Sequence, residues 1–181
     1  MTRAGDPAEV AGPNGPVLIA LGANLPSERF GGPRETLESA LREIERQGVR
    51  VLRRSRWHES APVPASDQPW YVNGVVSVAT ALGPEALLGV LHQIEAEFGR
   101  VRAERNAPRV VDLDLIAYGD IVRPGPEAPL LPHPRAAERA FVLLPLAEVA
   151  PGWRHPESGE TVEALIARLP PGQEIRPVSD S

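Results

Sequence analysis

The sequence predicts an α+β fold in which an antiparallel β-sheet is covered by α-helices. Short apolar segments rich in β-branched residues alternate with two longer segments whose apolar residues recur every three or four positions. Proline and glycine separate these segments, and none of the separating stretches is typical of a linker between domains. Toward the C-terminus the strand patterns give way to helical ones. The chain of 181 residues fits a single domain with its own core.

The first half of the chain predicts three strands and one helix. Residues 17–21 and 71–82 are apolar and β-rich, and residues 49–57 alternate between apolar and arginine positions. Residues 33–47 have the spacing of an amphipathic helix, with proline near the start and glycine after the end. Gly74 interrupts the third strand and indicates a bulge or the close approach of another group.

The second half predicts a helix over residues 84–98, a strand over 110–118 and a helical C-terminal extension over 135–169. The resulting order β-α-β-β-α-β is that of the ferredoxin-like arrangement, an antiparallel sheet with helices packed on it. The expected organisation is a disordered leader (residues 1–16), a single domain (17–170) and a frayed tail (171–181).

Composition excludes several kinds of chemistry. The net charge of −5 does not favour a general nucleic-acid-binding surface. All nineteen basic residues are arginines, so lysine Schiff bases and a P-loop lysine are excluded, and the absence of cysteine excludes thiolate sites. No apolar run approaches the roughly 20 residues of a membrane span. We therefore expect a cytoplasmic protein without membrane or nucleic-acid partners, and the single-domain length favours a monomer.

An acidic pair beside an arginine-rich segment is the strongest chemical signal in the sequence. Asp112 and Asp114 are two positions apart, so a strand at residues 110–118 directs both carboxylates to one face, about 6.6 Å apart along the backbone. On the other face we expect Leu113, Leu115 and Ala117. Carboxylates supply the oxygen ligands that magnesium prefers, and the preceding arginines can neutralise phosphate oxygens. The pattern indicates a site for magnesium and a polyphosphate.

Several motifs, in order, resemble those of one enzyme family. They are ALGANL at residues 20–25, DQPWYVN at 67–73, IEAEFGR at 94–100, APRVVDLDL at 107–115 and LPHPRAAERAFVL at 131–143. Together they resemble the 6-hydroxymethyl-7,8-dihydropterin pyrophosphokinases of folate biosynthesis. The APRVVDLDL element is highly specific, whereas ALGANL alone is weak evidence.

The resemblance implies transfer of a pyrophosphoryl group from MgATP to the hydroxymethyl group of the dihydropterin, with release of AMP. It implies that Asp112 and Asp114 bind two magnesium ions, and that Arg100 and Arg109 are catalytic arginines that reach the phosphates. Positioning and charge stabilisation carry most of the catalysis in such a transfer.

The resemblance also implies which residues bind the two substrates. Two aromatics sandwich the pterin ring, and an asparagine amide offers donors and an acceptor to the ring edge. The expected pterin contacts are Ser60, Ala61, Pro62, Val63, Tyr71, Asn73 and Phe141. The expected ATP contacts are His92, Glu95, Arg102, Arg109, His133 and Arg139.

The chain departs from the family pattern at three places. Asn106-Ala107 stands where Trp-Gly is common, which removes a large hydrophobic residue from the arginine segment. Pro134 replaces a frequent tyrosine, and His92 a frequent glutamine. Two other interpretations remain open: a different magnesium-dependent nucleotidyl- or phosphotransferase with the aromatics in its core, and a non-catalytic module that binds an anion through the arginines.

Overall fold

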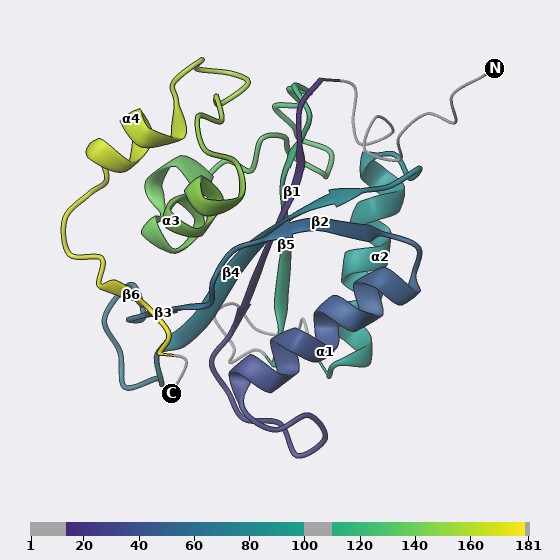
Figure 1. Ribbon diagram of the computed structural model, residues 1–181, viewed down its shortest axis with the longest axis vertical. Coiled ribbons are helices and arrows are strands. Elements are labelled where there is room, and N and C mark those ends of the chain that lie inside the picture. The colour runs from purple at the N-terminus through teal and green to yellow at the C-terminus, as the bar shows by residue number, and fades with distance from the viewer. Residues whose placement is uncertain (1–13, 100–109, 180–181) are drawn as a thin grey trace.

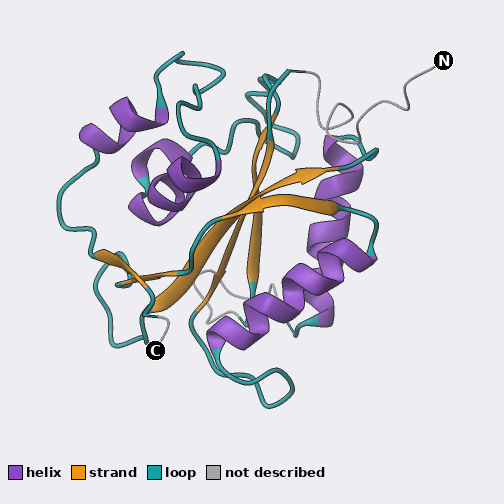
Figure 2. Ribbon diagram, in the orientation of Figure 1, coloured by secondary structure: helices purple, strands orange, loops and turns teal. Residues whose placement is uncertain are grey.

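The computed structural model describes residues 14–99 and 110–179 and consists of three layers (Figure 1). In chain order, the elements are β1 (Val17–Ala23), α1 (Pro33–Arg46), β2 (Arg50–Arg54), β3 (His58–Ser60), β4 (Tyr71–Ala79), α2 (Pro84–Glu97), β5 (Asp112–Tyr118), the 3₁₀ helix η2 (Ala136–Glu138), α3 (Ala140–Val149), α4 (Val162–Ala167) and β6 (Ile175–Pro177). A twisted sheet forms the middle layer, with α1 and α2 on one face and α3 and α4 on the other (Figure 2).

Within the part of the chain that the structure describes, the sheet has six strands, and every pairing is antiparallel. β1 lies between β4 and β5, so the strand order along the sheet is β5-β1-β4-β3-β6. β4 is long enough to pair with β3 at its beginning and with β2 at its end. The structure therefore confirms the predicted antiparallel sheet with helices packed on it.

Strand alternation distributes the apolar side chains of β1 between two cores. Val17, Ile19 and Leu21 face α1 and α2, whereas Leu18 faces α3. Full burial of a large aliphatic side chain stabilises the fold by about 1.5–3 kcal/mol. The first core also contains Leu37, Ile44, Leu87, Leu91 and Ile94, and the second contains Val75, Val142, Leu143, Leu146, Trp153 and Leu165.

The strand expected at residues 49–57 is shorter, because β2 ends at Arg54, and a separate strand, β3, follows it and meets a different part of β4. Between them, the hydroxyl of Ser55 accepts a hydrogen bond from the Val75 N–H at 3.0 Å, and the Trp57 ring folds over Gly74. A Cβ on Gly74 would lie 2.6 Å from that ring. The close approach expected at Gly74 is therefore observed. The indole of Trp57 fills the space, and Trp57 lies in the gap between β2 and β3.

A bulge in β5 turns Ala117 to the face opposite the one predicted for it. Leu18 pairs with Ala117 but Ile19 pairs with Leu115, which leaves Ile116 as an extra residue in β5. Ile116 and Ala117 both pack in the α3-side core, whereas Leu115 packs in the α1–α2 core. Simple alternation holds from Asp112 to Leu115 and fails after it.

Part of the C-terminal segment 171–181, for which the sequence predicts a frayed tail, forms a strand. Ile175–Pro177 forms β6, which pairs with β3. Without β6, the backbone groups on this side of β3 would have no strand partner. A segment as short as β6 has too few residues to show a strand periodicity in the sequence. Residues 1–13 of the expected leader lie outside the described residues.

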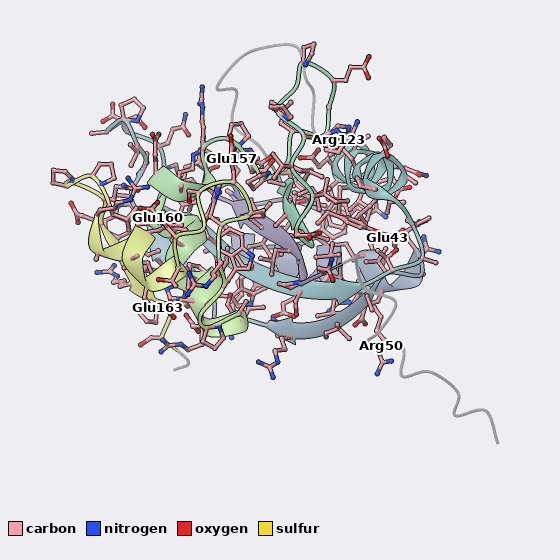
Figure 3. All side chains as sticks on the ribbon, turned by 90° about the horizontal axis from the view of Figure 1, so that it is seen from above. Glu43, Arg50, Arg123, Glu157, Glu160 and Glu163 are labelled. Atoms are coloured by element: carbon pink, nitrogen blue, oxygen red, sulfur yellow. The ribbon has the colours of Figure 1, made fainter. Side chains whose placement is uncertain are left out.

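Some charged side chains point away from the layers. Arg50 and Glu163 project from the outside of the molecule (Figure 3). Among the described residues, no helix combines the length and apolar character that crossing a membrane requires.

Candidate functional site

Four residues lie in one row across one end of the sheet. Gly22 of β1 pairs with Asp112 of β5 on one side and with Asn73 of β4 on the other, and Asn73 pairs with His58 of β3. We call these four residues the sheet-end row. Directly opposed residues share one face of a sheet, so their side-chain positions face the same layer. Residues from four strands therefore meet at one place.

The sheet-end row faces the layer of α3 and α4. His58 Nε2 lies 2.5 Å from Glu148 Oε2 on α3, which identifies the face. Asp114 pairs with Ala20, which packs in the α3-side core, whereas Leu113 packs in the α1–α2 core. The two aspartates thus lie on one face, as expected from their spacing.

Asn73 is buried, with 5% exposure, and is held by close neighbours. Its Nδ2 donates a hydrogen bond to Ser60 Oγ at 2.6 Å. A Cβ on Gly22 would lie 2.9 Å from Asn73 Oδ1, so only glycine leaves room for the amide in this position. The glycine of the ALGANL motif therefore accommodates a side chain from the neighbouring strand.

The segment before β4 is tied to the end of β1 by Asn24. Its Nδ2 donates to Gln68 Oε1 at 3.1 Å and to the Pro69 carbonyl at 3.3 Å. Gln68 Oε1 also accepts a hydrogen bond from the Tyr71 hydroxyl at 3.4 Å. We did not single out Asn24 or Gln68 from the sequence, although both lie within the quoted motifs. Buried polar groups joined across 44 residues cannot be recognised from local periodicity.

Tyr71, at the beginning of β4, pairs with Ser60 at the end of β3, next to the sheet-end row. Ala61, Pro62 and Val63 follow Ser60, with Val63 exposed. Phe141 is the second residue of α3, and its partly buried side chain packs against the α3-side core. The structure therefore places the expected pterin contacts on or beside one face of the sheet.

His133 connects the aspartates to the segment before α3. Its backbone N–H donates to the Ile116 carbonyl at 2.8 Å, and its Nδ1 accepts from the Arg135 N–H at 3.2 Å. Burial lowers the pKa of the imidazole, and Arg139 and Arg135 lower it further, while Asp112 acts in the opposite direction. These influences favour a neutral ring that carries its proton on Nε2.

Arg139 is the N-cap residue of α3, and its guanidinium lies 5.4 Å from the centre of the Phe141 ring. Such a placement is typical of a cation–π contact. His133, Arg139 and Phe141 thus all lie on the short segment 133–141.

Glu95 does not lie on the face of the sheet-end row. It is 1% exposed, and its Oε2 accepts a hydrogen bond from the Leu113 N–H at 3.1 Å. Within the described residues β5 is an edge strand, so Glu95 accepts a hydrogen bond from a backbone group between the two aspartates that no described strand pairs with. His92 is exposed one turn earlier on α2.

Four arginines of the arginine-rich segment lie outside the described residues: Arg100, Arg102, Arg105 and Arg109. The Asn106-Ala107 departure lies outside them as well. Among the described residues, no group of three or more histidine, cysteine, aspartate or glutamate side chains could by itself hold a metal ion. A metal at Asp112 and Asp114 would therefore need further ligands, such as phosphate oxygens.

The site combines paired carboxylates, an amide and aromatic side chains at one end of an antiparallel sheet, a set that suits magnesium-bound phosphates beside a flat ring, as an enzyme that transfers phosphate groups requires. Comparison with known proteins makes the assignment specific. Residues 18–151 match the model of the 7,8-dihydro-6-hydroxymethylpterin-pyrophosphokinase family. The chain belongs to this family, and its members are ATP-dependent diphosphokinases.

Individual relatives agree with the family assignment. The chain is similar to the 2-amino-4-hydroxy-6-hydroxymethyldihydropteridine pyrophosphokinase of Synechocystis, with 42% identity over 84% of this chain and 75% of the relative. It is 41% identical to the enzyme of that name from Pseudomonas aeruginosa, over 83% of this chain and 90% of the relative. It also matches the folic acid synthesis protein fol1 of Pneumocystis carinii at 36% identity, over 91% of this chain but 21% of that longer protein.

Proposed function

We propose that this protein transfers a pyrophosphoryl group from MgATP to the hydroxymethyl group of 6-hydroxymethyl-7,8-dihydropterin in folate biosynthesis. The pterin hydroxyl oxygen forms a bond to the β-phosphorus, and the bond from that phosphorus to the α–β bridging oxygen breaks. The hydroxyl proton leaves, and AMP departs with the bridging oxygen. The observation that carries the proposal is the sheet-end row, which sets a carboxylate and a buried amide on one face, one strand apart.

The donor set at β5 suits magnesium bound together with ATP. Magnesium is usually held by one or two carboxylates, several waters and substrate phosphates rather than by a complete protein cage. Asp112 and Asp114 provide two such carboxylates on one face, and we propose that they hold two ions. When bound, the ions neutralise phosphate charge and lower the pKa of the attacking hydroxyl.

Asn73 and Ser60 form the proposed recognition edge for the pterin. Asn73 Nδ2 donates one of its two hydrogens to Ser60, which fixes the orientation of the amide, and we propose that Oδ1 accepts a hydrogen bond from the ring edge. Tyr71 and Phe141 provide the two aromatic surfaces, and the backbone from Ala61 to Val63 borders them. Stacking on both faces suits a flat heterocycle.

Histidine and arginine provide the proposed contacts to the triphosphate. With Nδ1 engaged by the Arg135 N–H, neutral His133 donates from Nε2 to a phosphate oxygen. Arg139 adds a positive charge on the same stretch. We propose further contacts to ATP from His92, Glu95, Arg102 and Arg109, and a catalytic role in charge stabilisation for Arg100 and Arg109.

We further propose that the fold is the ferredoxin-like arrangement. The order β5-β1-β4-β3 along the sheet, with α1 and α2 on one face, supports this class. In this arrangement β6 and the layer of α3 and α4 are additions to the β-α-β-β-α-β unit. The helices α3 and α4 pack on the face that carries the sheet-end row, and β6 extends the sheet beside β3.

An assay of AMP release tests the function directly. The purified full chain, with MgATP and 6-hydroxymethyl-7,8-dihydropterin, is expected to form AMP and the pterin diphosphate in equal amounts. A matched reaction with 6-methyl-7,8-dihydropterin, which lacks the attacking hydroxyl, is expected to form neither. AMP release that does not depend on the hydroxymethyl compound would refute the proposal.

A further inference from the structure

The five residues from Gln173 to Pro177 join two parts of the structure that otherwise lie on different elements. They pair with β3, beside which β6 lies in Figure 1, and they contact the beginning of α3. We call residues 173–177 the C-terminal strap. The proposed pterin site takes Ser60 and Ala61 from the β3 side and Phe141 from the α3 side. The strap therefore touches both walls of that site.

On the α3 side, Gln173 acts as an external cap of the helix. The first backbone N–H groups of a helix have no acceptor within it, and the N-cap residue Arg139 provides no side-chain hydrogen bond to them. Gln173 Oε1 instead accepts from the Ala140 N–H at 2.8 Å, one residue before Phe141. Gln173 Nε2 donates to the Glu138 carbonyl at 2.9 Å. One side chain thus holds the chain on both sides of Arg139.

On the β3 side, the strap is held by backbone pairing. Ile175 pairs with Ser60, and the Ala61 N–H donates to the Glu174 carbonyl at 3.1 Å. Arg176 adds an ion pair with Glu59, at 3.1 Å between Nε and Oε2. These contacts begin at the residue immediately after Gln173.

Arg176 also reaches the segment that leads into β4. Its guanidinium lies 4.9 Å from the centre of the Trp70 ring, and Trp70 directly precedes Tyr71. The strap therefore contacts a residue next to each of the two aromatics of the proposed pterin site.

The far end of α3 is held independently of the strap. Glu148, near the C-terminal end of α3, lies 3.0 Å from Arg56 Nε and 2.5 Å from His58 Nε2. Val142, Leu143 and Leu146 anchor the helix in the core. Loss of the Gln173 contacts would consequently loosen the first turn of α3, where Phe141 lies, without releasing the whole helix.

We propose that the C-terminal strap sets the width of the pterin site, and that Gln173 is a positioning residue that holds the Phe141 wall against the Ser60–Tyr71 wall. The inference depends on the proposed function, because it assigns a role at the pterin site. It predicts a larger effect on the dihydropterin than on ATP. The strap borders Ser60, Ala61 and Phe141, which we assign to the dihydropterin, whereas Arg139 is the assigned ATP contact beside Gln173.

Three variants of the full chain test the proposal. Gln173→Met keeps the length of the side chain but removes its hydrogen bonds to Ala140, Glu138 and the Pro170 carbonyl. Gln173→Glu keeps an oxygen that can accept from the Ala140 N–H. Gln47→Met is the matched control, because Gln47 also makes a side-chain hydrogen bond at a helix terminus. It is the C-cap of α1, in the opposite layer, and its Nε2 donates to Glu43 Oε1 at 3.0 Å. For each variant, kcat, the KM for each substrate and the thermal midpoint are measured.

We expect Gln173→Met to raise the KM for the dihydropterin roughly three- to tenfold, which corresponds to the loss of about one hydrogen bond. The KM for ATP should change less than about twofold, and Gln173→Glu should have a dihydropterin KM clearly below that of Gln173→Met. Gln47→Met should leave both KM values unchanged.

Two results would overturn the positioning role. One is a dihydropterin KM in Gln173→Met equal to that of the unaltered protein. The other is a parallel rise of both KM values, which would mean general loosening of the fold. Failure of the unaltered protein to release AMP would instead refute the proposed function, so the two failures are distinguishable.

Discussion

At the scale of single residues, two glycines leave space that a neighbouring side chain fills, and two aspartates have the spacing that puts them on one face. Gly22 has no Cβ because Asn73 Oδ1 occupies that space, and Gly74 has none because Trp57 does. Asp112 and Asp114 have the right spacing to share a face. Changes at these positions should therefore affect catalysis or substrate binding more than their modest size suggests.

Replacement of Asp114 by asparagine should abolish most of the activity. The variant loses the charged oxygen that we propose as a magnesium ligand. Stabilisation of charge through a metal ion contributes several kcal/mol in such reactions, so kcat should fall by at least about 100-fold. The measurement is kcat at saturating magnesium. The thermal midpoint should be preserved, because the substitution conserves size on a partly exposed site. A rate within a few-fold of the original would argue against a metal ligand.

Gly22→Ala should weaken binding of the dihydropterin. The added Cβ would lie 2.9 Å from Asn73 Oδ1 and would displace the amide from Ser60. We expect a rise of roughly tenfold in the KM for the dihydropterin, corresponding to about 1.4 kcal/mol. Gly89→Ala is the control, because a Cβ there meets nothing within 4 Å. Equal KM values in the two variants would show that the Asn73 amide does not bind the substrate.

At the scale of secondary-structure elements, the layers on the two faces of the sheet have different tasks. α2 supports β5 from behind, since Glu95 accepts a hydrogen bond from the backbone between the two aspartates. α3 brings Phe141 to the opposite face and is held there by Glu148 and Gln173. The edge strands β5 and β6 are both stabilised by contacts beyond their strand pairing.

The support of β5 by α2 can be measured with two substitutions of Glu95. Glu95→Ala leaves the Leu113 N–H without its acceptor, which should lower the free energy of unfolding by about 1–3 kcal/mol. Glu95→Gln keeps an acceptor oxygen and should cost markedly less. Urea unfolding provides the measurement. The proposed contact with ATP predicts in addition that Glu95→Gln raises the KM for ATP, and an unchanged value would restrict Glu95 to its structural role.

At the scale of the whole molecule, stability should decrease on acidification in two stages. Burial is the main cause that lowers the pKa values of His133 and His155 from 6.5. The unfolded chain therefore binds these protons first, and stability decreases as the pH falls through about 6.5. Hydrogen bonds from Arg54 and Arg46 lower the pKa values of Glu38 and Glu43 from 4.5, the latter to about 2. Their contribution is present above pH 4.5 and is lost below it.

Thermal midpoints recorded from pH 8 to pH 3 would test this dependence, with falls expected below about pH 6.5 and again below about pH 4.5. Glu43→Gln is the matched variant for the second stage, because it removes the titrating group and should flatten that part of the curve. A midpoint that stays constant down to pH 4, or a steeper fall in Glu43→Gln, would contradict the assignment.

Local patterns were sufficient for much of the fold and part of the site. The spacing of Leu37 and Ile44 predicted α1, and the period of two correctly placed Asp112 and Asp114 on one face. Gly74 correctly indicated a close approach. These features depend on residues a few positions apart, where the geometry of a helix or strand alone determines which side chains share a face.

The sequence by itself determined the order of the central elements, the acidic pair and the family to which the chain belongs. Only the tertiary structure decided that Ile116 is a bulge, that Glu95 lies behind β5, and that Gln173 joins the beginning of α3 to the β3 edge. Each of these depends on hydrogen bonds or pairing between residues far apart in the chain. Such contacts leave no local periodicity, because their partners are chosen by the packing of layers and not by neighbouring residues.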